Sequence, residues 1–155
     1  MTQENDLFDV AALAADRERR PILCLDFDGV LHSYRSGWRG EANIPDPPVP
    51  GFANFIEQAV REFQLAVHSS RSRSSEGREA MRLWLERHLM AHYRQFLPSA
   101  SEAARRAGAV VELIDFPSAK PAAFISLDDR AVTFTGTWPA IAELRAFRPW
   151  WGRDS

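Results

Sequence analysis

The sequence predicts an α/β protein whose mostly parallel sheet is covered by helices on both faces, as a three-layer sandwich. Short apolar runs alternate with segments that have the 3.6-residue periodicity of amphipathic helices. Parallel strands need crossover connections, and helices usually provide them, so this alternation favours a parallel sheet. Acidic or hydroxyl side chains stand directly after three of the apolar runs. In a parallel sheet these positions meet at one edge, where the chemistry of such folds takes place.

The apolar runs give the expected strands. They are residues 21–27 (PILCLDF), 64–69 (QLAVHS), 110–114 (VVELI) and 122–127 (AAFISL), with a further extended segment at 131–136 (AVTFTG). All are short, and the runs 21–27 and 122–127 begin at or directly after a proline and stop at an aspartate, which is typical of buried strands.

Helical periodicity places the expected helices between these runs. Residues 52–63 repeat apolar side chains at i, i+3, i+4, i+7, i+8 and i+11, and residues 81–89 repeat the same spacing. A short Ala-rich helix is expected at 101–108, ending at Gly108, and another at 139–147. Residues 31–50 are rich in Gly, Pro and aromatic residues without a period, so we expect an irregular loop beside the first strand.

Length and composition limit the remaining possibilities. The chain has 155 residues, enough for one domain, which we divide into an N-terminal helix or extension at 1–20, a core at 21–148 and a tail at 149–155. The formal charge of −2 provides no global basic field for a polyanion. One cysteine, a polar N-terminus and the lack of a long apolar stretch predict a cytoplasmic protein that does not span a membrane.

Five polar side chains are expected to converge at the carboxyl edge of the sheet. They are Asp26, Asp28, Ser69, Asp128 and Asp129. Carboxylates crowded in a partly buried site repel one another unless protons or a cation intervene. Ligation by oxygen atoms alone suits Mg²⁺, which keeps several waters and can share a phosphate oxygen. Lys120 adds positive charge, and the Ser69 hydroxyl can donate to phosphoryl oxygens, so the pattern indicates phosphate chemistry.

The order of these motifs resembles that of the haloacid dehalogenase (HAD) superfamily of aspartate-nucleophile phosphohydrolases. Residues 22–30 (ILCLDFDGV) resemble its first motif, 66–70 (AVHSS) its second, Lys120 its third and 125–131 (ISLDDRA) its fourth. The resemblance covers about residues 21–139 and implies a HAD-like Rossmannoid fold. The usual insertion points are short, so no large cap domain is expected.

The resemblance also implies roles for the acidic residues. Asp26 would be the nucleophile that accepts the phosphoryl group, and Asp28 would be the general acid and base. The metal would be bound by the Asp26 carboxylate, the Asp28 main-chain carbonyl and Asp128. Asp129 would bind it through water or support the ligands.

Residues beside these motifs are further candidates for contact with the substrate. Ser69 is preferred over Ser70 for the second motif, because Ser-Ser-Arg mimics the family's Thr-x-Arg. Ser70, Arg71, His32 and the flexible Gly29 are then expected on the substrate side.

Together with this resemblance, these residues predict a Mg²⁺-dependent phosphomonoester hydrolase, and the resemblance implies that it acts through an aspartyl-phosphate. Its substrate would be a phosphorylated small molecule or a phosphorylated nucleic-acid end. Two alternatives remain open from the sequence: a receiver-like switch that is phosphorylated without turnover, and a catalytically silent scaffold that binds nucleic acid. The order of Lys120 before the final acid pair disfavours the receiver. The oligomeric state is left open.

Overall fold

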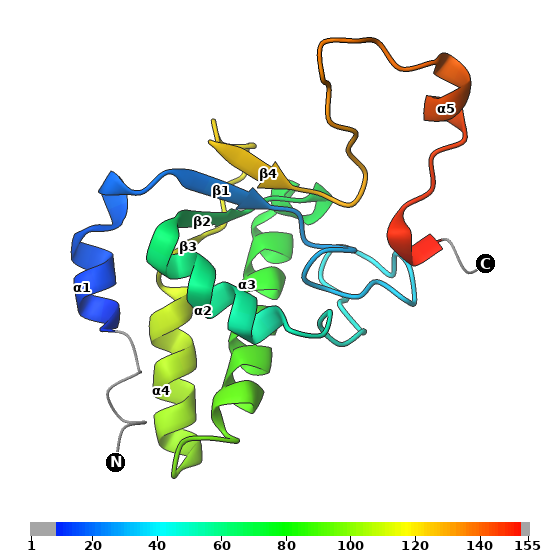
Figure 1. Ribbon diagram of the computed structural model, residues 1–155. Coiled ribbons are helices and arrows are strands. Elements are labelled where there is room, and N and C mark those ends of the chain that lie inside the picture. Colours follow the sequence, from blue (N-terminus) through cyan, green and yellow to red (C-terminus); the bar gives the residue numbers. More distant parts are fainter. Residues whose placement is uncertain (1–8, 153–155) are drawn as a thin grey trace.

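The computed structural model describes residues 9–152 and contains a sheet of four parallel strands (Figure 1). The strands are β1 (Ile22–Leu25), β2 (Gln64–Val67), β3 (Ile114–Asp115) and β4 (Ile125–Leu127), in the spatial order β3-β2-β1-β4. Every neighbouring pair is parallel. The expected α/β class with a parallel sheet is therefore confirmed.

The helices occupy the connections between the strands. They are α1 (Val10–Ala15), η2 (Arg17–Arg19), α2 (Phe52–Glu62), η3 (Ser70–Arg73), α3 (Ser75–Tyr93), α4 (Ala100–Val111), α5 (Ile141–Arg145) and η4 (Trp150–Gly152). None of the described helices is long and apolar enough to cross a membrane.

The core lies between one face of the sheet and the helices. Side chains alternate along a strand, so Leu23 and Leu25 of β1 face the same side, and both belong to the buried cluster that includes the apolar faces of α2, α3 and α4. At the centre of this cluster, the Trp84 indole meets the rings of Phe27 and Phe52 edge to face. Burial of these faces is the main force that holds the helices on the sheet.

The expected third layer is missing from the part of the chain that the structure describes. Figure 1 shows α2, α3 and α4 on one side of the sheet. Steps from β1 to β2 and from β2 to β3 run in one direction, so right-handed crossovers put their helices on the same face. The connection from β3 back to β4 reverses direction, and residues 116–124 form no helix there. The result is a two-layer arrangement with a loop in place of the second helical layer.

Two expected strands and one helix end were wrong. Val110 and Val111 lie in α4, which runs through Gly108, because they extend a helical stripe that includes Ala103 and Ala107 at i, i+4, i+7 and i+8. Only two residues then remain for β3. Residues 131–136 form no strand. They begin an arm, residues 131–147, that projects away from the sheet and includes α5 (Figure 1).

Candidate functional site

The candidate site lies at the carboxyl ends of β1 and β4. Asp26 follows β1 and its N–H donates to the carbonyl oxygen of Leu127, the last residue of β4, at 3.0 Å. Asp128 therefore emerges beside Asp26 although about a hundred residues separate them in sequence. The chain passes from β1 to β2 on one side, while β4 lies on the other. This is the switch point at which open α/β sheets bind ligands.

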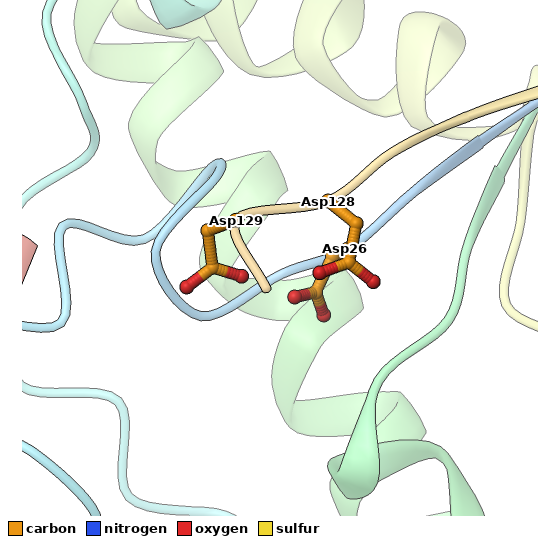
Figure 2. A group of neighbouring side chains, drawn as sticks. All are labelled: Asp26, Asp128 and Asp129. Atoms are coloured by element: carbon orange, nitrogen blue, oxygen red, sulfur yellow. The ribbon is translucent and has the colours of Figure 1, made fainter. Parts of the chain in front are cut away.

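Three carboxylates meet there (Figure 2). Asp26, Asp128 and Asp129 each offer one oxygen, and these oxygens all lie within 4.8 Å of one another. Burial, a hydrogen bond with Asp129 and the charge of Asp128 raise the pKa of Asp26 to about 8, although the Phe27 N–H opposes the shift. The folded chain thus binds a proton where a divalent cation would relieve the same repulsion.

Asp129 is the most enclosed of the three. Its side chain is 1% exposed, and its Oδ2 accepts a 2.5 Å hydrogen bond from the indole N–H of Trp151. The other oxygen, Oδ1, is buried and accepts no hydrogen bond from an N–H or hydroxyl group of the described residues. A buried carboxylate oxygen without such a donor is the kind of group that a metal ion satisfies. The three acids therefore fit a hard divalent cation.

Gly29 lies directly against the Asp129 side chain, and the C-terminal tail contacts both residues. The indole N–H of Trp150 donates to the Gly29 carbonyl at 2.7 Å. Gly29 has a φ of +83°, and a Cβ there would lie 2.3 Å from Asp129 Oδ2. Only glycine combines this conformation with this close approach.

Asp28 points to a different set of partners. Its Oδ1 accepts from His32 Nδ1 at 2.8 Å, and its Oδ2 accepts from Arg71 Nε at 3.0 Å. The Asp28 side chain is 14% exposed and borders the cavity. It is not a member of the three-carboxylate cluster. The two acids of the Asp-Phe-Asp motif thus have separate environments.

Arg71 is fully buried, so the structure does not place it against a substrate as expected. Besides Asp28, its guanidinium donates to the carbonyl oxygens of Gly40 and Glu41 at 2.7 and 2.8 Å, and it stacks on Trp38 at 4.7 Å. Arg71 therefore anchors the 31–50 loop to Asp28.

His32 is also fully buried, and its hydrogen bonds assign a role to each ring nitrogen. The backbone N–H of Asp46 donates to His32 Nε2 at 3.1 Å, so Nε2 is the acceptor. In that tautomer Nδ1 is the donor, and its hydrogen bond is to Asp28. Trp84 packs edge to face on the ring. His32 orients Asp28 and does not reach the substrate side.

Hydroxyl groups and one arginine complete the wall of the site. A cavity of about 270 Å³ is lined by Asp26, Asp28, Tyr34, Ser69, Ser70, Asp128 and Arg130. Ser69 caps η3 by accepting from the Arg71 N–H at 3.0 Å, and Ser70 is exposed beside it. Both serines therefore lie where the sequence places them.

Lys120 does not line this cavity. It is exposed and makes no hydrogen bond or ion pair within residues 9–152. Burial raises the pKa of the Cys24 thiol, and the charge of Lys120 acts against that rise, which puts the ammonium near β1. Because Cys24 and Asp26 are two residues apart, Lys120 approaches the strand that carries Asp26 without contacting the acid.

Sequence reasoning missed the contribution of the tail. Trp150 and Trp151 bind Gly29 and Asp129, Tyr34 meets the Trp151 ring edge to face at 5.2 Å, and Arg130 lies over the same ring. No periodicity links a C-terminal tryptophan pair to an acid 22 residues earlier. Two large apolar residues in a polar tail were the only available signal.

Comparison with family models, with curated proteins and with solved structures finds no match for this chain.

Proposed function

We propose that this protein is a Mg²⁺-dependent phosphomonoester hydrolase in which Asp26 is the nucleophile. The observation that carries the proposal is the division of the Asp-Phe-Asp motif. Asp26 belongs to a carboxylate cluster that fits a cation, whereas Asp28 is hydrogen-bonded by His32 and Arg71 at the edge of the same cavity. Acids in such different surroundings are suited to different roles in one reaction.

The proposed reaction has two steps. A carboxylate oxygen of Asp26 attacks phosphorus, and the bond to the leaving oxygen breaks while Asp28 supplies a proton to it. Asp28 then takes a proton from water, whose oxygen attacks the phosphorus of the aspartyl-phosphate. The second step releases inorganic phosphate and restores the Asp26 carboxylate.

The cation would be held by Asp26, Asp128 and Asp129, with the Asp28 main-chain carbonyl as a further ligand implied by the HAD resemblance. When bound, Mg²⁺ neutralises charge on the phosphoryl oxygens and on the nucleophile. Trp151 and Gly29 keep Asp129 in place for this role.

Several groups can bind the phosphoryl oxygens. The Ser69 hydroxyl, exposed Ser70 and Arg130 all line the cavity. Lys120 lies outside the cavity lining, and we expect its long flexible stem to bring a second positive charge to a bound phosphoryl group. Together, these donors and positive charges offset the negative charge of the three acids near a dianionic phosphoryl group.

The cavity supports a substrate that inserts a phosphoryl group and leaves its remainder outside. Its volume of about 270 Å³ lies just below the range of about 300–1,000 Å³ for pockets that enclose whole ligands. A phosphorylated small molecule or the phosphorylated end of a nucleic acid meets this requirement.

Turnover of p-nitrophenyl phosphate and of 3′- and 5′-phosphorylated oligonucleotides, with Mg²⁺ or with EDTA, tests the proposal. We expect Mg²⁺-dependent phosphate release that Asp26→Asn abolishes. Asp16→Asn, which changes an exposed aspartate outside the site, should retain full activity. Mg²⁺-dependent turnover that survives Asp26→Asn contradicts the mechanism, and salt-sensitive oligonucleotide binding without hydrolysis supports the silent scaffold.

A further inference from the structure

The arm, residues 131–147, exposes an apolar surface. Residues 131–142 carry no charged side chain, and residues 131–138 are all exposed. Its most exposed large side chains are Trp138 at 84% and Ile141 at 79%, and Phe134 is 56% exposed. The arm also encloses a hollow of about 1,000 Å³ that only arm residues line. Exposure of so many apolar side chains to water is unfavourable for a monomer and is typical of an interaction surface.

A second apolar surface lies on β4. Register pairs Ile125 and Leu127 with Leu23 and Leu25, so they face the side of the sheet on which the helices pack. Nevertheless Ile125 is 52% exposed and Leu127 is 47% exposed. β4 is also the edge strand of the described sheet, so its outer hydrogen-bonding groups have no strand partner there. Phe124, which precedes β4, is 74% exposed.

The arm is held away from the β4 of its own chain. It leaves the body after Asp129 and returns at Trp150, and both ends are fixed by the Trp150 and Trp151 hydrogen bonds. Between these ends it projects beyond the sheet (Figure 1). One chain therefore presents an arm whose residues 131–142 carry no charge, and an uncovered apolar strand, and the two do not cover each other.

We infer that a second copy of this chain is the partner, with the arm of each copy packed on β4 of the other. With a two-fold axis between the copies, the arm and β4 of both chains are covered at once. The assembly is then a closed dimer that does not grow further. No other partner is needed to cover the apolar side chains.

The exposed area is large enough for such a dimer. Taking about 150–250 Å² for a whole aromatic side chain, Phe124, Phe134 and Trp138 together expose on the order of 400 Å² per copy. The aliphatic residues Ile125, Leu127, Val132, Ile141 and Leu144 add to this area in both copies. The total approaches the roughly 1,200–2,000 Å² buried in a stable interface. This inference does not depend on the proposed function.

Sedimentation of the full chain at several concentrations tests the inference. We expect the unaltered protein to sediment as a dimer and Phe134→Ser/Trp138→Ser to sediment as a folded monomer, with its fold checked by circular dichroism. Phe96→Ser removes a phenylalanine after α3 that is 70% exposed and lies outside both surfaces, and this variant should remain a dimer. A monomeric unaltered protein overturns the inference, as does a dimer that the double substitution leaves intact.

Crosslinking distinguishes exchange of arms from other dimers. A tagged Phe134→Cys chain is mixed with an untagged Ile125→Cys chain, and a short bismaleimide is added; the native Cys24 is buried. Exchange predicts a tagged–untagged product that neither chain gives with the unaltered protein. Absence of this product, or a crosslink confined to single chains that carry both substitutions, overturns the exchange.

Discussion

Asp26 and Asp28 lie two residues apart, yet the fold gives each a different neighbour set. Asp26 faces two further carboxylates, while Asp28 faces one guanidinium and one imidazole N–H. The difference arises because β4 passes on one side of the turn and η3 on the other. Five of the site residues could be placed from the sequence because each closely follows a recognisable strand: Asp26, Asp28, Ser69, Asp128 and Asp129. The supporting roles of Arg71 and His32 depend on the path of the 31–50 loop, which has no sequence period.

The raised pKa of Asp26 predicts a pH-dependent stability in the metal-free protein. Between its ordinary value of 3.8 and about 8, the folded state holds a proton that the unfolded state has lost. Stability should therefore fall as pH rises through this range. Thermal melts from pH 5 to pH 8.5 in EDTA should show the fall, and Mg²⁺ should reverse it most strongly at high pH. Asp26→Asn should remove both effects, and a Mg²⁺ effect that weakens with rising pH contradicts the assignment.

Gly29 and Gly37 provide a matched pair of substitutions. Both have positive φ, but a Cβ at Gly37 meets nothing within 4 Å, whereas a Cβ at Gly29 meets Asp129 and Trp151. Gly37→Ala should cost about 1–2 kcal/mol from its left-handed backbone alone. Gly29→Ala should cost more and also weaken Mg²⁺ binding. Urea unfolding and Mg²⁺ titration measure the two effects, and equal costs at both positions would exclude the close approach.

Substitution of Arg71 should destabilise the fold far more than the same substitution of its neighbour Arg73. Arg71→Met removes the guanidinium that pairs with Asp28 and donates to the loop carbonyls, so the free energy of unfolding should fall by about 3–5 kcal/mol. Arg73→Met changes an exposed arginine of the same 3₁₀-helix and should cost little. Chemical denaturation of the two variants makes the comparison; similar values for both would mean that Arg71 is not an anchor.

At the scale of elements, the sequence predicts helices better than the short strands. Residues 52–62 and 81–89 fold as helices because their apolar spacing matches the core face, whereas Phe63, expected at the end of the first helix, is extended. Val110 and Val111 favour a strand by composition. They fold as helix because they continue the buried apolar face of α4. The segment 131–136 alternates as a strand would but finds no strand partner in its own chain. Tertiary packing, which local pattern does not contain, settles both cases.

The contacts of η4 lead us to expect that the tail supports the metal site. Trp151→Phe keeps the ring against Tyr34 and removes only the N–H bond to Asp129. A hydrogen bond to a charged group contributes about 1.5–3 kcal/mol, and loss of a group that orients a metal ligand lowers affinity about 10–100-fold. Calorimetric titration with Mg²⁺ should show such a loss for Trp151→Phe and none for Trp138→Phe. Unchanged affinity in Trp151→Phe would separate the tail from the metal site.

At the scale of the whole molecule, the strand order explains why the site forms where it does. β1 lies between β2 and β4, so the residues that follow these three strands meet at one end of the sheet. This arrangement follows from the expected parallel sheet, and the expected convergence of Asp26 with Asp128 and Asp129 is confirmed. The single helical layer and the projecting arm were not predictable, because they depend on the direction of one loop and on surfaces that the chain leaves uncovered.

The phosphorylated residue identifies the nucleophile most directly. The protein is mixed briefly with Mg²⁺ and p-nitrophenyl phosphate, quenched in acid and reduced with borohydride, which converts an aspartyl-phosphate into homoserine. Peptide mass spectrometry should find homoserine at position 26, dependent on Mg²⁺ and on substrate. Rapid turnover with an unmodified Asp26, or homoserine at another aspartate, would contradict the proposed mechanism.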